Sequence, residues 1–468
     1  MNAVEPYELS LHEAAEQIRE KKLSPVELTE SVLGRIKAVD ERVGAFVTVM
    51  QDQAVRAART AEKEIADGAY RGPLHGVCIA VKDLLDTAGV LTTSSSRTRA
   101  DHVPDTDAAV VEHLEAAGAV IIGKTHTHEF AYGVITPTTR NPWNLDHIPG
   151  GSSGGSGAAV AARMCQGAIG SDTGGSVRIP SAVCGTVGLK PTYGRVSRRG
   201  TTSLSWSLDH LGPLTNSVHD AALMMDAIAG YDRADPATRD VPVPRHTEQL
   251  TAGVENLVFG VPRNYFFDQL DPEVESAVRA AIEQLAGLGA ELREVEIPYP
   301  DLYMPAEFGI LVPEASAYHQ EALRKVGDLY EDDVRVLLEV GELMLATDYI
   351  KAQRMRTLIQ QGWRDMFDGL DAVLAPTLPA VAARVGELAF TWPDGEEEPV
   401  INSYVRTSAP GNLTGLPALS VPCGFSAGGM PIGLQIIGRP FAEPTVLRVG
   451  AAYEAATDWS DRRPAGLS

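Results

Sequence analysis

The chain has 468 residues, a formal net charge of −22, and hydrophobic and charged fractions of 44% and 22%. This length allows a sizeable core, and the acidic balance disfavours a surface built to bind nucleic acid. Four cysteines at scattered positions exclude a disulfide framework and the common zinc spacings. Residues 1–20 lack an apolar signal core and no segment has about 18 consecutive apolar residues, so we expect a cytoplasmic protein without membrane contact.

The N-terminal part of the chain is predicted to be helical. Ser10-Leu-His-Glu13 and Ser24-Pro-Val-Glu27 resemble capping boxes, the second with a proline at the first helical position. We expect residues 1–70 to form a helical segment that packs on a single domain spanning 1–468. Residues 71–200 would be the core that carries the chemistry.

Short apolar strands alternate with helices along the rest of the chain. Strands are expected at 77–81, 119–122, 257–261, 291–297, 372–374, 418–421 and 432–437, and helices at 105–117 and 272–288. Such alternation predicts an α/β fold with a layered sheet. The acidic tract Asp394–Glu398 is expected to be a solvated loop.

The segment Gly150–Pro180 carries two glycine-flanked serines, Ser152 and Ser176. Glycines let backbone N–H groups approach a reacting oxygen closely, so such a loop offers both a nucleophile and a cradle for an oxyanion. Glycine- and serine-rich runs are more often flexible linkers. Here apolar segments such as 158–162 flank the motifs, which favours a structured site over a linker.

Lys82 directly follows the predicted strand 77–81, which has almost no charge. Burial there would lower the pKa of the lysine and allow the neutral amine to act as a base. Deprotonating a lysine of unperturbed pKa at pH 7 costs roughly 4–5 kcal/mol of free energy. The surroundings of Lys82 must offset this cost. A salt bridge from Lys82 to Asp83 or Asp86 is the alternative, purely structural role.

Together these segments resemble the amidase signature family of Ser–Ser–Lys hydrolases. The matching segments are Gly76–Asp83, Gly150–Gly157 and Gly170–Pro180, with further similarity at 188–192, 371–377 and 411–425. The resemblance implies a single large α/β domain with a central mixed β-sheet covered by helices on both faces. It also implies hydrolysis of linear amides through an acyl-enzyme, with no cofactor and no metal.

The family roles carry over position by position. Ser176 would attack the amide carbonyl, Ser152, behind a cis peptide bond, would pass the proton, and Lys82 would be the base. The backbone N–H groups implied for the oxyanion hole are those of Thr173, Gly174, Gly175 and Ser176. The residues expected to support the motif structurally are Ser153, Asp172 and Arg178.

Other motifs allow different interpretations. Gly118–Thr125 matches the phosphate-loop pattern, but its middle residues form a predicted strand preceded by a helix, the wrong context for ATP. Gly151–Gly155 matches the nucleophile elbow of α/β-hydrolases, but that fold needs a late histidine, and the last one is His319. His126 and His128 could bind the metal of a metal-dependent amidohydrolase, line the cleft or cap a helix. A non-catalytic binding protein is disfavoured because every residue of the catalytic motifs is present.

The resembled family contains simple amidases and the A subunit of glutamyl-tRNA(Gln) amidotransferase, which frees ammonia from glutamine and works with a partner. In that protein the region matching Asp333–Gly341 carries consecutive arginines, one of which would hold the glutamine carboxylate. Only Arg335 remains here, and the segment Ser203–Asp209 also departs from the pattern. Both departures favour a stand-alone enzyme over the glutamine-hydrolysing alternative, with a homodimer left open.

Aromatic residues are expected near the substrate cleft. Phe130, Tyr132 and Trp206 lie in segments close to the catalytic motifs. The sequence therefore predicts a small neutral, partly apolar amide as the substrate, with an anilide or a carbamate as related possibilities.

Overall fold

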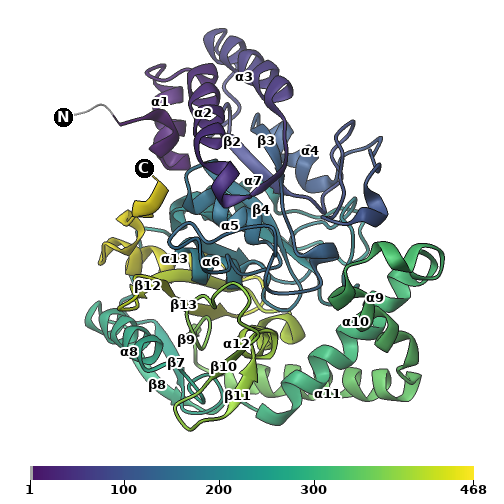
Figure 1. Ribbon diagram of the computed structural model, residues 1–468. Coiled ribbons are helices and arrows are strands. Elements are labelled where there is room, and N and C mark those ends of the chain that lie inside the picture. The colour runs from purple at the N-terminus through teal and green to yellow at the C-terminus, as the bar shows by residue number, and fades with distance from the viewer. Residues whose placement is uncertain (1–3, 468) are drawn as a thin grey trace.

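The computed structural model describes residues 4–467 and is built around one 11-stranded β-sheet (Figure 1). The strand order is β1-β3-β2-β4-β6-β5-β12-β13-β9-β7-β8. The strands are β1 (Phe46–Val49), β2 (Cys78–Lys82), β3 (Val120–Thr125), β4 (Gly167–Asp172), β5 (Val187–Lys190), β6 (His210–Thr215), β7 (Val258–Pro262), β8 (Glu291–Val295), β9 (Ala372–Pro376), β12 (Ala418–Phe425) and β13 (Pro431–Gly438). A separate hairpin pairs β10 (Ala389–Thr391) with β11 (Glu397–Pro399).

The helices connect and cover these strands. They are α1 (Leu11–Arg19), α2 (Pro25–Val43), α3 (Gln51–Ala66), α4 (Ala109–Ala116), α5 (Gly154–Ala161), α6 (Arg178–Cys184), α7 (Val218–Ile228), α8 (Pro272–Gly287), α9 (Tyr303–Val326), α10 (Asp332–Leu343), α11 (Ala346–Met366), α12 (Val400–Thr414) and α13 (Glu443–Ala455).

The sheet is mixed. β2 pairs in parallel with β3 and β4, β7 pairs in parallel with β8 and β9, and the remaining pairs are antiparallel. Parallel neighbours need a crossover connection, which α4 provides between β2 and β3 and α8 between β7 and β8. The predicted α/β class with a mixed sheet is confirmed.

Helices cover both faces of the central strands. On β4, a side chain at Gly167 would meet Met224 of α7, whereas one at Gly170 would meet Ser153 at the start of α5. Because successive strand positions point to opposite faces, α5 and α7 lie on opposite sides of the sheet. α6 packs beside α5, and α13 packs against α7 and α8.

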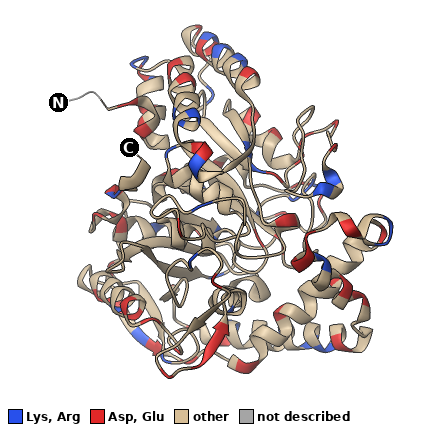
Figure 2. Ribbon diagram, in the orientation of Figure 1, with Lys and Arg blue, Asp and Glu red and all other residues tan. Residues whose placement is uncertain are grey.

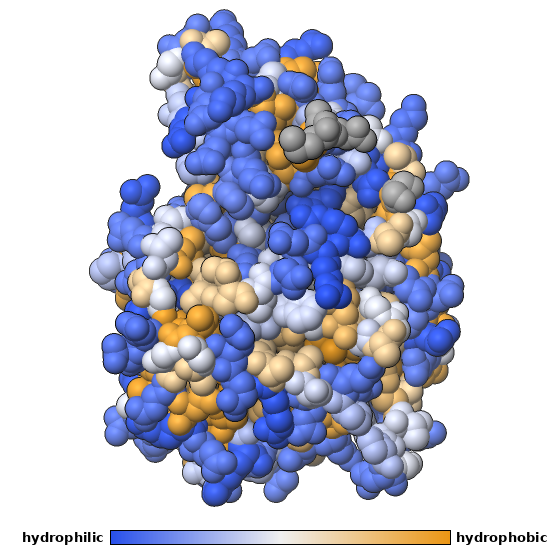
Figure 3. All heavy atoms as spheres, turned by 90° about the vertical axis from the view of Figure 1, so that its left-hand side faces the viewer, coloured by the Kyte–Doolittle hydropathy of each residue, from blue (hydrophilic) through white to orange (hydrophobic). Residues whose placement is uncertain are grey.

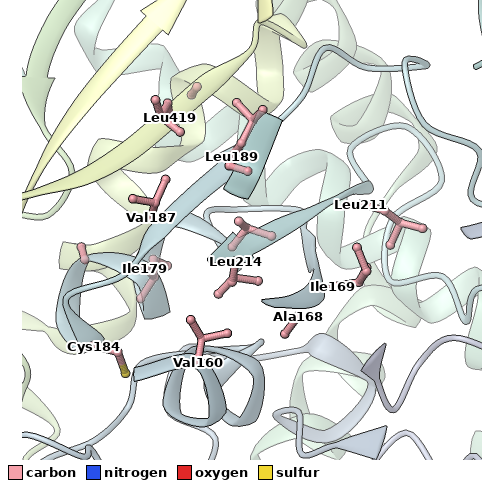
Figure 4. Close-up of a cluster of buried hydrophobic side chains, with 14 of the residues drawn as sticks. Val160, Ala168, Ile169, Ile179, Cys184, Val187, Leu189, Leu211, Leu214 and Leu419 are labelled. Carbon is pink, nitrogen blue, oxygen red and sulfur yellow. The ribbon is translucent and has the colours of Figure 1, made fainter. Parts of the chain in front are cut away.

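Dense apolar packing covers both faces of the central strands (Figure 4). Leu214 of β6 lies on the same face as Val160 of α5 and Ile179 of α6. Ile169 of β4 and Leu189 of β5 point to the opposite face, and all five side chains are buried. Strands covered on both faces need no polar alternation, which explains their short, continuous apolar sequences. Charged side chains lie mainly on the outer helices and loops (Figure 2).

The N-terminal segment forms the expected helices with one difference in capping. Ser10 and Glu13 form the complete capping box. The Ser24 hydroxyl caps α2 by accepting from the N–H groups of Val26 and Glu27, and it donates to Glu62. Among the described residues, the Glu27 carboxylate makes no return bond to the Ser24 N–H, so the predicted capping box is only half formed. The face that carries this segment and the chain ends is mainly hydrophilic, with scattered apolar groups (Figure 3).

Two sequence predictions need correction. The helix expected at 105–117 begins only at Ala109, because the N–H groups of Ala108 and Ala109 donate to the carbonyls of Asp86 and Arg199 in neighbouring loops. The acidic tract is not a solvated loop throughout, since its end forms strand β11, where Glu398 pairs with Arg406 at 3.3 Å. Among residues 4–467, no helix has the length and apolar character needed to cross a membrane.

Candidate active site

Lys82 is the last residue of strand β2, whereas the sequence predicted that the strand would end at Val81. Its side chain is fully buried. Its Nζ donates to the hydroxyls of Ser152 at 2.7 Å, Ser153 at 2.9 Å and Ser171 at 2.8 Å. An ammonium has three protons to donate, so all three hydroxyls are matched in the charged form. In the neutral form the amine keeps two donors and offers its lone pair to the third hydroxyl.

Burial lowers the pKa of Lys82 well below its ordinary value, and the more distant charges of Asp172 and Asp209 only partly oppose this. The alternative salt bridge from Lys82 to Asp83 is not formed. Asp83 lies instead 3.7 Å from Lys124 Nζ, which also donates to the hydroxyl of Thr92 at 2.8 Å. Lys82 is therefore a buried amine with only neutral hydrogen-bond partners.

Ser153 and Ser171 tie the two catalytic segments together. The Ser153 hydroxyl donates to the Ser171 carbonyl at 3.1 Å and accepts from the Ser171 N–H at 3.2 Å. A Cβ at Gly170 would lie 2.7 Å from the Ser153 hydroxyl, so only glycine permits this approach. Sequence reasoning overlooked Ser171, although it stands inside the Gly170–Pro180 motif.

Ser152 and Ser176 lie close to each other at the junction of their two motifs. The Gly151–Ser152 peptide bond is cis, and the Ser153 N–H donates to the Ser176 carbonyl at 3.3 Å. Ser176 is 5% exposed, just before α6. Within residues 4–467 no hydrogen bond joins the two hydroxyls, so the Ser152 hydroxyl is oriented by Lys82 alone.

The loop before Ser176 presents free backbone donors. Among the described residues, the N–H groups of Thr173, Gly174 and Ser176 donate to no other group. The N–H of Gly175 donates to Asp172 Oδ1 at 3.0 Å, with Gly175 at φ +121°. Gly175 is thus a turn position of the loop whose N–H is already bonded, and the expectation that this N–H lines an oxyanion hole is wrong.

Asp172 and Arg178 form a fully buried ion pair that shapes this loop. Arg178 donates to both carboxylate oxygens of Asp172, at 2.9 and 3.0 Å, and Asp172 also accepts from the Val177 N–H at 3.1 Å. Burial tends to raise the pKa of Asp172, but the guanidinium outweighs it and holds that pKa well below its usual range. Arg178 further donates to the Ser408 carbonyl and Gln435 Oε1, at 2.9 and 2.7 Å.

We expect Asp172→Asn to destabilise the fold by about 3–5 kcal/mol, because it leaves the Arg178 charge buried and poorly compensated. Urea unfolding followed by circular dichroism measures the change. The matched control is Arg335→Gln, which breaks an exposed pair with Asp332 at 2.9 Å and should change stability by less than about 1 kcal/mol. Equal losses in both variants would contradict the assigned role of the buried pair.

A second loop, Ser203–Asp209, lies beside the nucleophile loop. Asp209, half-buried, accepts from the Thr173 hydroxyl at 2.8 Å and from the Ser203 hydroxyl at 2.7 Å. Glu314 of α9 accepts from the Ser205 hydroxyl at 2.6 Å and the Ser207 N–H at 2.9 Å. The segment Ser203–Asp209 is thereby clamped between the nucleophile loop and α9, which the sequence did not indicate.

Two cavities adjoin the catalytic residues and share Ala131 and Leu204 in their linings. One, of about 30 Å³, is lined by Ser176 and Gly174 together with Tyr132, Phe308, Leu311, Ile401 and Val405 among others. The other, of about 130 Å³, includes Ser171, Thr173 and Trp206 in its lining. Two of the expected cleft residues, Tyr132 and Trp206, thus line different cavities.

Phe130 lies outside the lining of both cavities. It is buried and packs edge-on against His319 with ring centroids 4.4 Å apart and beside Tyr330 at 5.5 Å. Trp206 is 60% exposed at the rim, with Arg198 Cζ 5.3 Å from its ring centre. Tyr132 is the one expected aromatic residue that lines a cavity together with Ser176.

The residues of the alternative motifs have other partners. His126 Nδ1 lies 3.2 Å from the Ser95 hydroxyl, and His128 Nε2 lies 3.0 Å from Asp333. Within residues 4–467, no group of three or more His, Cys, Asp or Glu side chains is arranged to hold a metal ion. Lys124 of the phosphate-loop-like motif is buried in β3, and Arg335 pairs with acidic neighbours around α10 and lines neither cavity.

Comparison with known proteins identifies the family of the chain. A family model described as Amidase covers residues 27–447. An "Amidase" from Pseudomonas putida is 53% identical over 97% of each chain, and the A subunit of the glutamyl-tRNA(Gln) amidotransferase from Geotalea daltonii is 41% identical over 99% of this chain and 100% of its own. The crystal structure of a bacterial aryl acylamidase of the amidase signature family superposes with a TM-score of 0.88, 30% identity and 97% and 98% coverage of the two chains. The chain is therefore an amide hydrolase that belongs to the amidase signature family.

Proposed function

We propose that the protein hydrolyses a small neutral, partly apolar amide through an acyl-enzyme formed on Ser176. The observation that carries this proposal is the buried Lys82 amine, 2.7 Å from the Ser152 hydroxyl and without a charged hydrogen-bond partner. A lysine with a lowered pKa can accept a proton near neutral pH. Ser152 accepts from that amine, and the N–H of the next residue, Ser153, donates to the carbonyl of Ser176, which supports Ser152 as the proton carrier.

In the proposed first step the Ser176 hydroxyl attacks the amide carbonyl. Its proton passes to Ser152, whose own proton passes to Lys82. The negative charge that develops on the carbonyl oxygen is held by the free N–H groups of Thr173, Gly174 and Ser176, each worth a few kcal/mol in the transition state.

In the second half the proton returns from Lys82 through Ser152 to the leaving nitrogen, and the C–N bond breaks. Water then attacks the ester carbonyl on Ser176, and the same relay removes its proton. The bond to the Ser176 oxygen then breaks, the proton returns from Lys82 through Ser152 to that oxygen, and the carboxylic acid product leaves. Both halves reuse one base and one set of backbone donors, so no cofactor enters the proposal.

The apolar lining of the cavity beside Ser176 supports the proposed substrate class. Tyr132, Leu204, Phe308 and Leu311 offer no charge to bind an amino-acid carboxylate. Arg335, the single arginine left from the glutamine-binding pattern, pairs instead with Asp328 and Asp332. These placements favour a simple amidase over the glutamine-hydrolysing alternative, despite the identity with such a protein over the full chain.

The substrate class is tested with purified protein on a panel of aliphatic amides, anilides, carbamates and glutamine. We expect kcat/KM for the best apolar amide or anilide to exceed that for glutamine by about 100-fold or more, since a hydrophobic contact contributes roughly 1–3 kcal/mol per group. Released amine or ammonia is quantified. Efficient glutamine hydrolysis with poor turnover of apolar amides would assign the chain to the alternative function.

A further inference from the structure

One carboxyl group beside the proposed active site has no partner. Glu307 of α9 is fully buried, and neither of its carboxyl oxygens makes a hydrogen bond among the described residues. Buried polar side-chain atoms are almost always paired, and leaving them unpaired costs stability. An unpaired carboxyl that is kept inside the protein therefore calls for a ligand.

The position of Glu307 points to the substrate pocket. Its Oε1 lies 3.2 Å from where a Cβ on Gly174 would be, and Val405 Cγ1 lies 3.6 Å from the same point. Gly174 and Val405 both line the small cavity that contains Ser176. On α9 the next residue, Phe308, and Leu311 one turn later line it as well. The carboxyl thus lies immediately behind the wall of an otherwise apolar pocket.

The charge state of this carboxyl suits a site close to a developing oxyanion. Burial raises the pKa of Glu307 well above its usual value, and the opposing effect of Arg356 is smaller. Arg356 is itself engaged elsewhere, donating to the carbonyls of Leu413 and Ser207, each at 2.9 Å. A neutral carboxyl can both donate and accept a hydrogen bond without repelling negative charge on the carbonyl oxygen.

We propose that Glu307 determines specificity by hydrogen bonding to a polar substituent, a hydroxyl or an amine, carried by the substrate within a few bonds of the scissile carbonyl. This inference rests on the proposed function, and it narrows the substrate class from partly apolar amides to those with one such donor. An alkyl substituent in the same place would leave the buried carboxyl unpaired, and this penalty underlies strong discrimination between isosteric substrates.

The test compares paired amides that differ only at this substituent, such as 2-hydroxypropionamide with 2-methylpropionamide and the 3-substituted counterparts. The wild type should favour the hydroxyl member of at least one pair by about 10-fold or more in kcat/KM. Glu307→Leu should reduce the ratio to about one. Glu307→Gln should keep most of the preference, because an amide also donates and accepts. Glu321→Gln, at an exposed position on the same helix, is the matched control.

The outcomes separate this proposal from the proposed function. If the wild type hydrolyses amides but shows no preference within any pair, or if Glu307→Leu keeps the wild-type ratio, the role of Glu307 is refuted while amide hydrolysis stands. If the wild type hydrolyses no amide, the proposed function fails. Binding is then measured separately, as the melting-temperature shift that each intact amide gives with the Ser176→Ala variant. The hydroxyl member of a pair should give the larger shift, and this difference should disappear when Glu307→Leu is added. Equal shifts within every pair would refute the role of Glu307.

Folding is controlled within the same experiment. Removing an unpaired buried carboxyl should leave the melting temperature of Glu307→Leu equal to or above that of the wild type. Should leucine prevent folding, Glu307→Met, with a flexible side chain of similar length, takes its place in the paired comparison. A large loss of stability with an unchanged substrate ratio would show a purely structural carboxyl and overturn the proposal.

Discussion

Replacing Ser176 by alanine is expected to lower kcat by about 10⁴-fold or more, because it removes the hydroxyl on which the acyl-enzyme is proposed to form. Covalent labelling by a serine-directed phosphonate should disappear at the same time. Turnover is measured with the best amide of the substrate panel, and the label is located by mass spectrometry of the intact protein and its peptides.

The matched control for this variant is Ser181→Ala. Ser181 is a buried serine of the following helix α6, and its hydroxyl makes no hydrogen bond in the described part of the chain. This control should keep both activity and label. Labelling of Ser152 in the wild type, or persistent turnover by Ser176→Ala, would show that the nucleophile has been assigned to the wrong serine.

Lys82→Met is expected to reduce kcat/KM by about 10²–10⁴-fold, the usual contribution of a general base. The fold should persist, because methionine fills the space of the lysine stem and removes a buried amine. Lys124→Met is the control. It also removes a buried amine, but this amine belongs to the adjacent strand and donates to Leu85 and Thr92 rather than to Ser152. Its folded fraction should retain near wild-type kcat, and comparable loss in both variants would contradict a specific role for Lys82.

The pH dependence follows from the lowered pKa of Lys82. In the native protein the Lys82 amine is unprotonated at pH values where the amine of the unfolded chain still holds its proton. Activity should therefore fall as the pH drops through the folded-state pKa. The free energy of unfolding should rise with pH between that value and about 10.4, where the unfolded amine titrates. A pH series of kcat/KM and of urea unfolding checks both, and the Lys82→Met variant should lack this stability component.

Much of the site can be predicted from sequence because its residues lie in contiguous motifs. Ser152, Ser176 and Lys82 are all marked by their glycine-rich or apolar neighbours. The network that supports them comes from distant segments, and no local pattern marks it. Asp209, just before β6, binds Thr173, just after the neighbouring strand β4, and Glu307 approaches Gly174 from a helix that the sequence analysis did not identify.

The errors have equally specific causes. Gly175 has the right motif position for an oxyanion donor, but its N–H is taken by the carboxylate of Asp172. Phe130 is aromatic and near the motif in sequence, yet it packs against His319 and Tyr330 away from the cavities. Helix α4 starts late because loop carbonyls capture its first N–H groups. In each case a tertiary contact decided what sequence position alone could not.

The reach of Arg178 has a consequence for biosynthesis. This side chain shapes the nucleophile loop, yet it donates to Ser408, Asn412 and Gln435, which belong to α12 and β13. During translation the ribosome makes these anchors long after the serine motifs have emerged. The nascent chain therefore carries the serine motifs before α12 and β13, which hold Arg178 in place, have been made. We expect the nucleophile loop to reach its final arrangement only when β13 has joined the sheet.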